Sequence, residues 1–304
     1  MNESIECLAC DSSHIGRLIA LGGTYYPPGS PALVPSYLDW FYLQNPVGRA
    51  MLCVATEGGK WIGVIVFIPV LLEVDQRKQD AYFAVNVLTH PQHRTKNLFV
   101  KMIKASSKVL ARRSVWLLGH PNANAAPGWS RQKMQFRAPL VPRLTRPGAP
   151  WKALHRVRVY HRADLVDFFN HSMAASESYG GIRLNYSPEF IEWRYLKSPI
   201  RKYVVTIEMC GGEPAGLRVC RRFKGPIDLL VDFVGSRAML PVVLRSSTTP
   251  ALLFFPEAGL LRKEVDAATW RLPVSRRLPF FLTDWSGATA WQDSSGITLG
   301  ASDF

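Results

Sequence analysis

The sequence predicts a mixed α+β fold made of two similar halves in tandem, each with a central mixed β-sheet flanked by helices. Three observations support this fold class. The chain has 304 residues and is 47% apolar, which is enough for one large domain or two ordinary ones. A pattern of aromatic residues occurs twice, 153 residues apart. Within each half, strand-like and helix-like segments are interspersed.

The repeat indicates that one supersecondary unit has been duplicated. Residues 36–46 align with residues 189–199 without a gap, and identities in one register extend beyond them. We therefore expect two domains, 1–150 and 151–304, joined by the Pro/Arg-rich stretch 139–150. The residues matched at this offset are Trp40 with Trp193, Tyr42 with Tyr195, Leu43 with Leu196, Pro46 with Pro199, Gly59 with Gly212, Gly63 with Gly216, and Asp11 with Asp164.

Each copy is expected to contain the same elements in the same order. A strand leads into a helix capped by Asp11 or Asp164, and a short aromatic helix with a Trp-x-Tyr-Leu pattern follows. A β-hairpin with a Gly-Gly turn comes next. The predicted strands are 5–8, 50–56 and 61–68 in the first copy, and 156–160, 202–209 and 215–220 in the second; the aromatic helix lies within 36–46 and 189–199.

The segment 81–113 carries the strongest chemical signal. Residues 81–88 predict a strand, residues 89–97 a polar turn, and residues 98 to about 113 a helix. The first N–H groups of such a helix lack partners and point outward, so they form an anion site that Arg94 and Lys96 would strengthen. The strand would place Ala81, Phe83, Val85 and Val87 on one face, and the helix has an apolar stripe (Leu98, Met102, Ile103, Val109, Leu110) and a basic face (Lys101, Lys104, Lys108, Arg112).

The charge distribution favours an anionic ligand or partner. The formal net charge is +14, and the 83 residues between Asp80 and Asp164 contain no carboxylate but sixteen lysines and arginines. A phosphate-rich small molecule, an acidic carrier protein and nucleic acid all fit this charge. A merely solubilising surface is the plain alternative, although such surfaces usually mix both signs.

These residues resemble a known family. His90-Pro91-x-x-Arg94-x-Lys96-x-Leu98-Phe99, after the strand 85–88, resembles the acyl-CoA signature of the GNAT N-acyltransferases. Residues 119–125 followed by 134–136 resemble a further segment of some members. The sequence departs from the family at Thr95 and Asn97, where glycines are usual, and at Phe99, where a small residue is frequent. The second half lacks the turn, and such tandem pairs resemble GNAT enzymes of bacterial surface-polysaccharide biosynthesis clusters.

The resemblance implies transfer of an acyl group, most simply acetyl, from coenzyme A to an amine of a small metabolite such as an amino sugar or sugar nucleotide. The implied co-substrate is acetyl-CoA or another acyl-CoA, with no metal. The implied contacts are Val87, Leu88 and Thr89 with pantetheine, Arg94, Thr95, Lys96, Asn97, Leu98 and Phe99 with the pyrophosphate, and Asn122 and Asn124 with the thioester end.

The candidates for catalysis are few, because no carboxylate lies near the turn. His120 has a suitable ordinary pKa for a general base, or is simply a satisfied histidine at a strand end. Asn86 would orient a water or the acceptor. Asp232, on the matching strand of the second half, either reaches a cleft between halves or stabilises the fold. Trp40 and Arg194 are candidate acceptor-binding residues; their plain alternatives are a core tryptophan and a solvated arginine.

Two other functions remain open at this stage. In the first, the donor would be an acyl-carrier protein or an aminoacyl-tRNA, as in Fem-type proteins. In the second, the chain would be a catalytically inactive module that binds nucleic acid or an acidic partner through its basic face. The absence of a signal-peptide pattern, of a membrane-spanning apolar run and of a cysteine framework (five cysteines) predicts a cytoplasmic protein. The pair Cys7 and Cys10 lacks the second pair of a metal site and is expected at a strand end.

Overall fold

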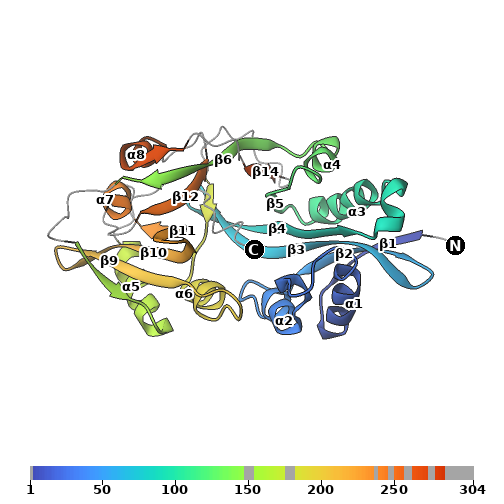
Figure 1. The fold of residues 1–304 in the computed structure, drawn as a ribbon, viewed down its shortest axis with the longest axis horizontal. Coiled ribbons are helices and arrows are strands. Elements are labelled where there is room, and N and C mark those ends of the chain that lie inside the picture. The colour runs from blue at the N-terminus through green and yellow to red at the C-terminus, as the bar shows by residue number, and fades with distance from the viewer. Residues whose placement is uncertain are drawn as a thin grey trace. The chain divides into compact units, whose positions relative to one another are not determined.

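The computed structural model describes residues 3–146, 154–174, 182–235, 239–245, 250–256, 262–272 and 278–284. Helices and strands alternate in the mixed arrangement that the sequence predicts (Figure 1). The chain divides into two compact units that are not continuous halves. Of the described residues, unit 1 contains 3–71, 79–137 and 279–284, and unit 2 contains 72–78 and those between 138 and 278.

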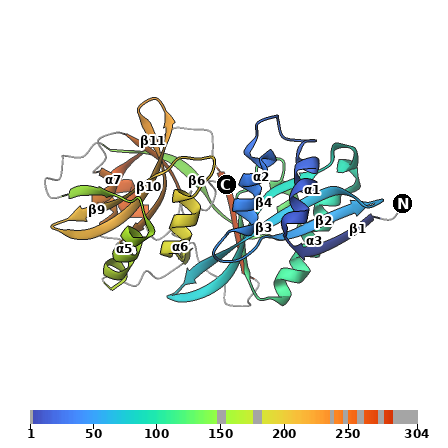
Figure 2. The ribbon, with the colours of Figure 1, turned by 90° about the horizontal axis from the view of Figure 1, so that it is seen from below.

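The sheet of unit 1 has the strand order β1-β2-β3-β4-β5-β14. Its first strands are antiparallel, β4 and β5 are parallel, and β14 returns antiparallel to β5. Helices α1 and α2 cover one face and α3 and α4 the other (Figures 1 and 2). The elements are β1 (Glu3–Ala9), α1 (Ser12–Gly22), η1 (Pro31–Leu33), α2 (Pro35–Leu43), β2 (Met51–Glu57), β3 (Lys60–Val74), β4 (Arg77–Thr89), η2 (Pro91–Lys96), α3 (Leu98–Arg112), β5 (Trp116–Gly119), α4 (Ala126–Arg131) and β14 (Leu278–Asp284).

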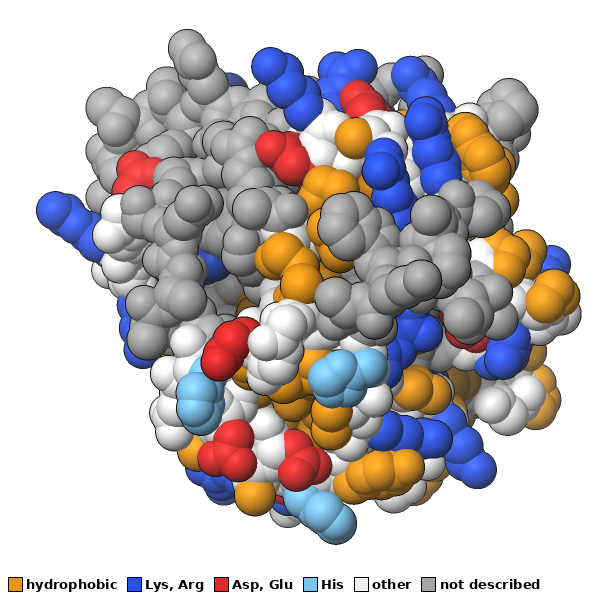
Figure 3. Space-filling model, turned by 90° about the vertical axis from the view of Figure 1, so that its left-hand side faces the viewer, with side chains coloured by type: hydrophobic (Ala, Val, Ile, Leu, Met, Phe, Trp, Pro, Cys, Tyr) orange, Lys and Arg blue, Asp and Glu red, His pale blue; other side chains and the backbone are white. Residues whose placement is uncertain are grey.

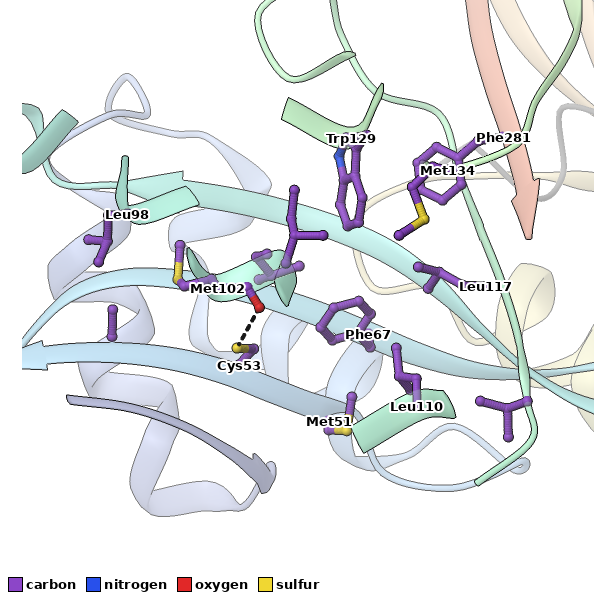
Figure 4. Close-up of a cluster of buried hydrophobic side chains, with 14 of the residues drawn as sticks. Met51, Cys53, Phe67, Leu98, Met102, Leu110, Leu117, Trp129, Met134 and Phe281 are labelled. Atoms are coloured by element: carbon purple, nitrogen blue, oxygen red, sulfur yellow. Dashed lines mark hydrogen bonds between the residues drawn. The ribbon is translucent and has the colours of Figure 1, made fainter. Parts of the chain in front are cut away.

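A buried cluster joins α3 to this sheet (Figure 4). The predicted apolar stripe is confirmed, since α3 buries Leu98, Met102, Ile103 and Leu110 in it. Trp129 of α4 and Phe281 of β14 also belong to this cluster, and their tilted rings pack with centroids 4.9 Å apart. The predicted basic face of α3 is exposed at all four of its positions. The segregation of apolar and basic side chains thus fixes how α3 lies on the sheet.

Unit 2 also has a mixed β-sheet flanked by helices, but its strands follow one another in a different order. Its strand order is β6-β12-β11-β10-β9-β7, with β11 and β12 parallel. The short strand β8 pairs with residues 72–74, and β13 pairs with β6. The elements are β6 (Phe136–Thr145), β7 (Leu154–Arg158), α5 (Arg162–Ala174), β8 (Ile182–Leu184), α6 (Pro188–Ile191), the π-helical η3 (Glu192–Leu196), β9 (Val204–Cys210), β10 (Glu213–Lys224), β11 (Ile227–Gly235), α7 (Leu240–Arg245), β12 (Ala251–Pro256), α8 (Arg262–Ala268) and β13 (Thr269–Arg271).

The duplication inferred from sequence is visible in the element bounds. Helix α2 covers Pro35–Leu43, and α6 with η3 covers residues 188–196, which is the same span shifted by 153. Strands β2 and β9 correspond in the same way. The hairpin turn after each has two glycines with positive φ, namely Gly58 and Gly59, and Gly211 and Gly212. The repeat therefore reflects shared backbone geometry.

Two local expectations are corrected. The stretch 139–150 is not a free linker, because residues 139–145 belong to β6, which pairs with β12 and β13; residues 147–150 lie outside the described part. Pro142 has no N–H to donate to a neighbouring strand. Its carbonyl still takes part in hydrogen bonding, because it accepts from the N–H of Leu272 at 3.3 Å. Asp164 lies inside the first turn of α5 and accepts from the N–H groups of Tyr160 and His161. Asp11, in contrast, caps α1 as predicted.

The charges of the face drawn in Figure 3 are mixed. Lysine and arginine side chains lie there beside carboxylates and histidines. This face shows the pattern of an ordinary solvated surface and carries no functional argument. In the described part of the chain no helix is long and apolar enough to cross a membrane.

We predict that Gly119→Ala destabilises unit 1. A Cβ at Gly119 would lie 2.7 Å from Cζ of Phe281, whose side chain is fully buried and has no room to move. Overpacking of this kind lowers the free energy of unfolding by about 1–3 kcal/mol. Urea denaturation measures the change.

The matched control is Gly16→Ala, in the middle of α1, where an added Cβ would meet nothing within 4 Å. Alanine in an open helical position raises the free energy of unfolding by about 0.5–1 kcal/mol. Equal stability of the two variants would contradict the packing described for β5 and β14.

Candidate functional site

The parallel strands β4 and β5 of unit 1 stop pairing at the carboxyl end of β5, and β4 continues beyond this point. The ladder joins residues 81–84 of β4 to Trp116–Gly119 of β5 and stops there. β4 continues through residues 85–89, and the next residue, His90, still donates its N–H to the Ile62 carbonyl of β3 at 2.8 Å. Among the described residues, no strand pairs with 85–89 on the β5 side. This edge of β4 therefore offers backbone donors and acceptors to a ligand.

Asn86 causes a change of face within β4. Its φ is +44°, a left-handed value that asparagine tolerates better than most residues. Ala81, Phe83 and Val85 are buried on one face, but after Asn86 the buried residue is Leu88. Val87 packs instead with the α3-side cluster, on the face of Tyr82 and Ala84. The expectation that Val87 shares a face with Val85 is thus wrong, because the backbone bulges at Asn86.

Two tyrosines hold the Asn86 side chain. Tyr26 Oη donates to Asn86 Oδ1 at 3.2 Å, and Asn86 Nδ2 donates to Tyr42 Oη in a short hydrogen bond. Burial raises the pKa of Tyr26 to about 12 and the pKa of Tyr42 further, so both phenols stay protonated. Tyr26 follows α1 and Tyr42 lies on α2, so helices on one face of the sheet orient a side chain at the open edge.

No functional role for these two tyrosines is predicted from the sequence. Tyr42 belongs to the repeated aromatic pattern, whereas Tyr26 belongs to none of the motifs. The signal lies in the second copy, where the matching Tyr195 also forms a hydrogen bond with a polar residue on a sheet strand: Tyr42 accepts from Asn86, and Tyr195 donates to Asp232. A tyrosine that is repeated together with a polar strand residue is a pattern that sequence comparison of the two halves could reveal.

The turn between β4 and α3 has the conformation needed to expose backbone N–H groups. Residues 91–96 form the short helix η2, and Asn97 then takes a left-handed conformation (φ 53°, ψ 27°) before α3 begins. Thr95 lies within η2 and needs no left-handed geometry. The Asn97 side chain does not cap α3, and the first turn of α3 has no acidic residue. The helix start is therefore electropositive and open to an anion.

Arg94 stands beside this helix start. It is exposed, and its guanidinium lies 5.8 Å from the ring centroid of Tyr25. Leu98, in contrast, is buried in the core, so only its backbone can meet a ligand. Lys96 belongs to η2 and Thr89 ends β4. Of the residues predicted to hold the pyrophosphate, Arg94 thus has an exposed cationic side chain, and Leu98 has only its backbone available.

The large Phe99 is accommodated away from the turn. Its ring meets Trp129 edge to face at 5.6 Å, and a Cβ on Gly128 would lie 2.3 Å from Phe99 Cε1. The absence of a side chain at Gly128 therefore makes the space that Phe99 fills between α3 and α4. This explains how the chain tolerates a phenylalanine where a small residue is frequent.

The loop after β5 is held by Asn122. Its Oδ1 accepts hydrogen bonds from the N–H groups of Asn124 (3.1 Å) and Ala125 (2.9 Å), which orders the entry to α4. Asn124 is exposed on the same loop. Of the two asparagines predicted at the thioester end, Asn122 thus stabilises the turn that leads into α4.

His120 ends β5 in an apolar cage. Its ring stacks on Phe280 at 4.9 Å and lies 5.7 Å from Phe83, and Nδ1 is 3.2 Å from the Pro279 carbonyl. Burial lowers its pKa to about 4, so the expectation of an ordinary pKa is wrong. The neutral ring donates from Nδ1–H to Pro279. Its Nε2 is buried and has no hydrogen-bond partner in the described part of the chain.

Asp232 lies in the interior of unit 2. Only 1% of it is exposed, and it accepts from Tyr186 Oη (2.5 Å), Tyr195 Oη (2.7 Å) and the N–H of Phe233 (3.0 Å). A carboxylate with three donors is satisfied where it is, which is the pattern of a structural anchor.

The two predicted acceptor-binding residues are also interior. Trp40 is 4% exposed and packs against Phe41. Arg194 is 1% exposed, with its guanidinium 5.9 Å from the Tyr195 ring, so the alternative of a solvated arginine is wrong. Both side chains are thus buried, and their acceptor-binding role stays a prediction.

No model of a known protein family matches the sequence, and no curated protein matches it. Solved structures do match. A GCN5-related N-acetyltransferase from Anabaena variabilis matches 93% of this chain and 73% of its own, with TM-score 0.64 and 10% identity. Saccharomyces cerevisiae N-myristoyltransferase with bound myristoyl-CoA matches 93% of this chain and 83% of its own, with TM-score 0.53 and 12% identity.

A third match bears on the duplication. A tandem GNAT protein from the clavulanic acid biosynthesis pathway matches 95% of this chain and 100% of its own, with TM-score 0.55 and 13% identity. The chain therefore has the GNAT fold in tandem form, as the resemblance implied. At these identities the matches speak for the fold alone, and the polysaccharide association stays a prediction.

The lowered pKa of His120 predicts a pH dependence of stability. The unfolded chain binds a proton at this histidine near pH 6.5, whereas the folded chain binds it only near pH 4. Acidification through this interval therefore favours the unfolded state, by about 2–3 kcal/mol at its lower end. Urea denaturation at several pH values measures the loss.

His120→Gln is the control, because glutamine keeps a donor for Pro279 and does not titrate. We expect its stability to fall less than that of the wild type between pH 6.5 and pH 4. Parallel pH profiles of the two proteins would show that His120 is not held neutral.

Proposed function

We propose that the chain is an acyl-CoA-dependent N-acyltransferase whose donor site is in unit 1. The observation that carries this proposal is the open edge of β4 at residues 85–89, next to the uncapped start of α3. Pantetheine contains two amide groups in line, so it can pair with such a strand edge as another strand would. The pyrophosphate would then reach the N-terminus of α3 and Arg94.

Transfer requires an amine to attack the thioester carbonyl. A C–N bond forms, the C–S bond breaks, the amine loses a proton and the departing thiolate gains one. A backbone N–H on the open edge of β4 would stabilise the negative charge that develops on the carbonyl oxygen. Holding both reactants in this geometry supplies much of the rate enhancement. Nothing in this scheme needs a covalent enzyme intermediate or a metal.

The residues near the reacting atoms have distinct tasks in this proposal. Asn86 orients the acceptor or a water, because two tyrosines fix its amide. His120 is too weak a base to be charged near neutral pH, so it would act through Nε2 as a hydrogen-bond acceptor. Asp232, Trp40 and Arg194 receive no part, since their burial supports structural roles.

The acceptor we propose is an amine of a small metabolite, with amino sugars and sugar nucleotides as the first to test, and the acyl group is acetyl. A carrier protein presents the same pantetheine, so the strand edge alone does not choose between donors. The match to a protein solved with myristoyl-CoA favours coenzyme A. Aminoacyl-tRNA as donor gains no support from the matched structures.

We predict that Arg94→Ala weakens acetyl-CoA binding about tenfold, because it removes a charge-assisted contact to the pyrophosphate. Arg112→Ala is the matched control: it is another exposed arginine, but it ends α3 far from the turn. Calorimetric titration with acetyl-CoA, repeated at two salt concentrations, measures both. Absence of binding by the wild type would overturn the proposed donor, and equal losses in the two variants would overturn the proposed site.

We further predict that Asn86→Gly lowers kcat about tenfold or more while acetyl-CoA affinity changes little. Glycine suits the left-handed backbone at this position, so the variant removes the amide without strain. Release of CoA thiol with a panel of amino sugars and sugar nucleotides is the assay. Tyr26→Phe, which removes one of the two bonds to Asn86, should give a smaller loss. Unchanged turnover in Asn86→Gly would remove Asn86 from the mechanism.

A further inference from the structure

Two cysteines lie directly opposite each other in unit 1. In the β1–β2 ladder, Cys7 of β1 faces Cys53 of β2, and the register is regular from Glu3 to Ala9. Facing residues of an antiparallel pair point to the same face, and both cysteines belong to the cluster beneath α3. No other cysteine is the ladder partner of a cysteine in the described strands.

The parity of the ladder brings these two side chains close. The N–H of Cys10 donates to the Ala50 carbonyl at 2.7 Å, which makes residues 10 and 50 a hydrogen-bonded pair. Hydrogen-bonded and non-hydrogen-bonded pairs alternate along an antiparallel ladder, so Cys7 and Cys53 form a non-hydrogen-bonded pair. In such pairs the Cα atoms are about 4.5 Å apart, which lies within the range of about 4.4–6.8 Å that disulfides span.

The two thiols differ in their exposure to solvent and in the direction in which their pKa values are shifted. Cys7 is partly exposed, whereas Cys53 is fully buried and donates to the Met102 carbonyl of α3 at 3.3 Å (Figure 4). When the proton of Cys53 turns from Met102 toward Cys7, it can donate to the Cys7 thiolate; this lowers the pKa of Cys7, and the nearby Arg113 acts in the same direction. The neighbouring Cys7 and burial raise the pKa of Cys53. Cys7 is therefore the accessible nucleophile, and Cys53 holds the proton.

We propose that Cys7 and Cys53 are a thiol-modification site that forms a reversible intramolecular disulfide with small-molecule disulfides. The Cys7 thiolate attacks one sulfur of the small disulfide, which forms a mixed disulfide and releases one thiolate. Cys53 then loses its proton and attacks Cys7 Sγ, which releases the second thiol. Two protein thiols are oxidised to one disulfide, and one small disulfide is reduced to two thiols.

The other three cysteines lack these features. Cys10 and Cys220 are buried, and burial raises their pKa values to about 12 and about 11. Cys210 is partly exposed, as Cys7 is, but its ladder partners are Leu154 and Glu213. Cys210 is thus the matched control for accessibility without a facing thiol.

The test treats the full chain with bis(2-hydroxyethyl) disulfide, then unfolds it, blocks remaining thiols with iodoacetamide and measures the intact mass and the peptide map. We expect a linked peptide that contains Cys7 and Cys53, alkylated Cys10 and Cys220, no link to Cys210, and full reversal by dithiothreitol. In Cys53→Ser, the mixed disulfide on Cys7 should persist. In Cys7→Ser, Cys53 should stay unmodified. Cys210→Ser should react as the wild type does.

Three outcomes would overturn the proposal. One is a stable mixed disulfide on Cys7 of the wild type, because Cys53 would then have failed to resolve it. A second is a linked peptide that contains any other cysteine. The third is five alkylated thiols after treatment, provided that the same reagent modifies an unfolded sample of the protein. The result does not depend on the proposed enzymatic activity.

Discussion

The left-handed backbone at Asn86 is the constraint on which unit 1 depends. It ends the regular alternation of β4, moves Val87 to the α3 side and coincides with the loss of β5 as a partner. A bulge of this kind costs free energy, and here the hydrogen bonds from Tyr26 and to Tyr42 offset that cost. The backbone that becomes available at the strand edge is a direct result. Fold and candidate site therefore share one origin.

The second unit uses the same device for a different end. Asp232 on β11 is held by Tyr186 and by Tyr195, the counterpart of Tyr42, and the β10–β11 register shifts beside it. The first copy thus has a neutral amide, Asn86, at an open strand edge. The second copy has a buried carboxylate, Asp232, that accepts hydrogen bonds from two tyrosines. Duplication followed by different use of equivalent positions accounts for both arrangements. The polar partner of the repeated tyrosine is what distinguishes the copies.

The features of the fold that depend on local sequence patterns could be predicted from the sequence. The tandem plan, the amphipathic α3, the cap at Asp11 and the Gly-Gly hairpins follow from periodicity and turn chemistry. Features that depend on contacts between residues far apart in the sequence could not be predicted in this way. The pKa of His120 depends on Phe280 and Pro279, about 160 residues along the chain. Residues 139–145 join a sheet only because β12 and β13 lie beside them, and the burial of Arg194 likewise depends on tertiary packing.

The position of β14 has a consequence for how the protein is made. β5 ends at Gly119, and β14, the strand that pairs with it and covers it with Phe281 and Leu282, begins only at Leu278, so β5 leaves the ribosome long before its partner strand. Until then unit 1 has an uncovered β-edge, which is prone to pairing with other chains. The core of unit 1 is therefore completed only after β14 has been synthesised, and a product terminated before β14 would expose this edge permanently.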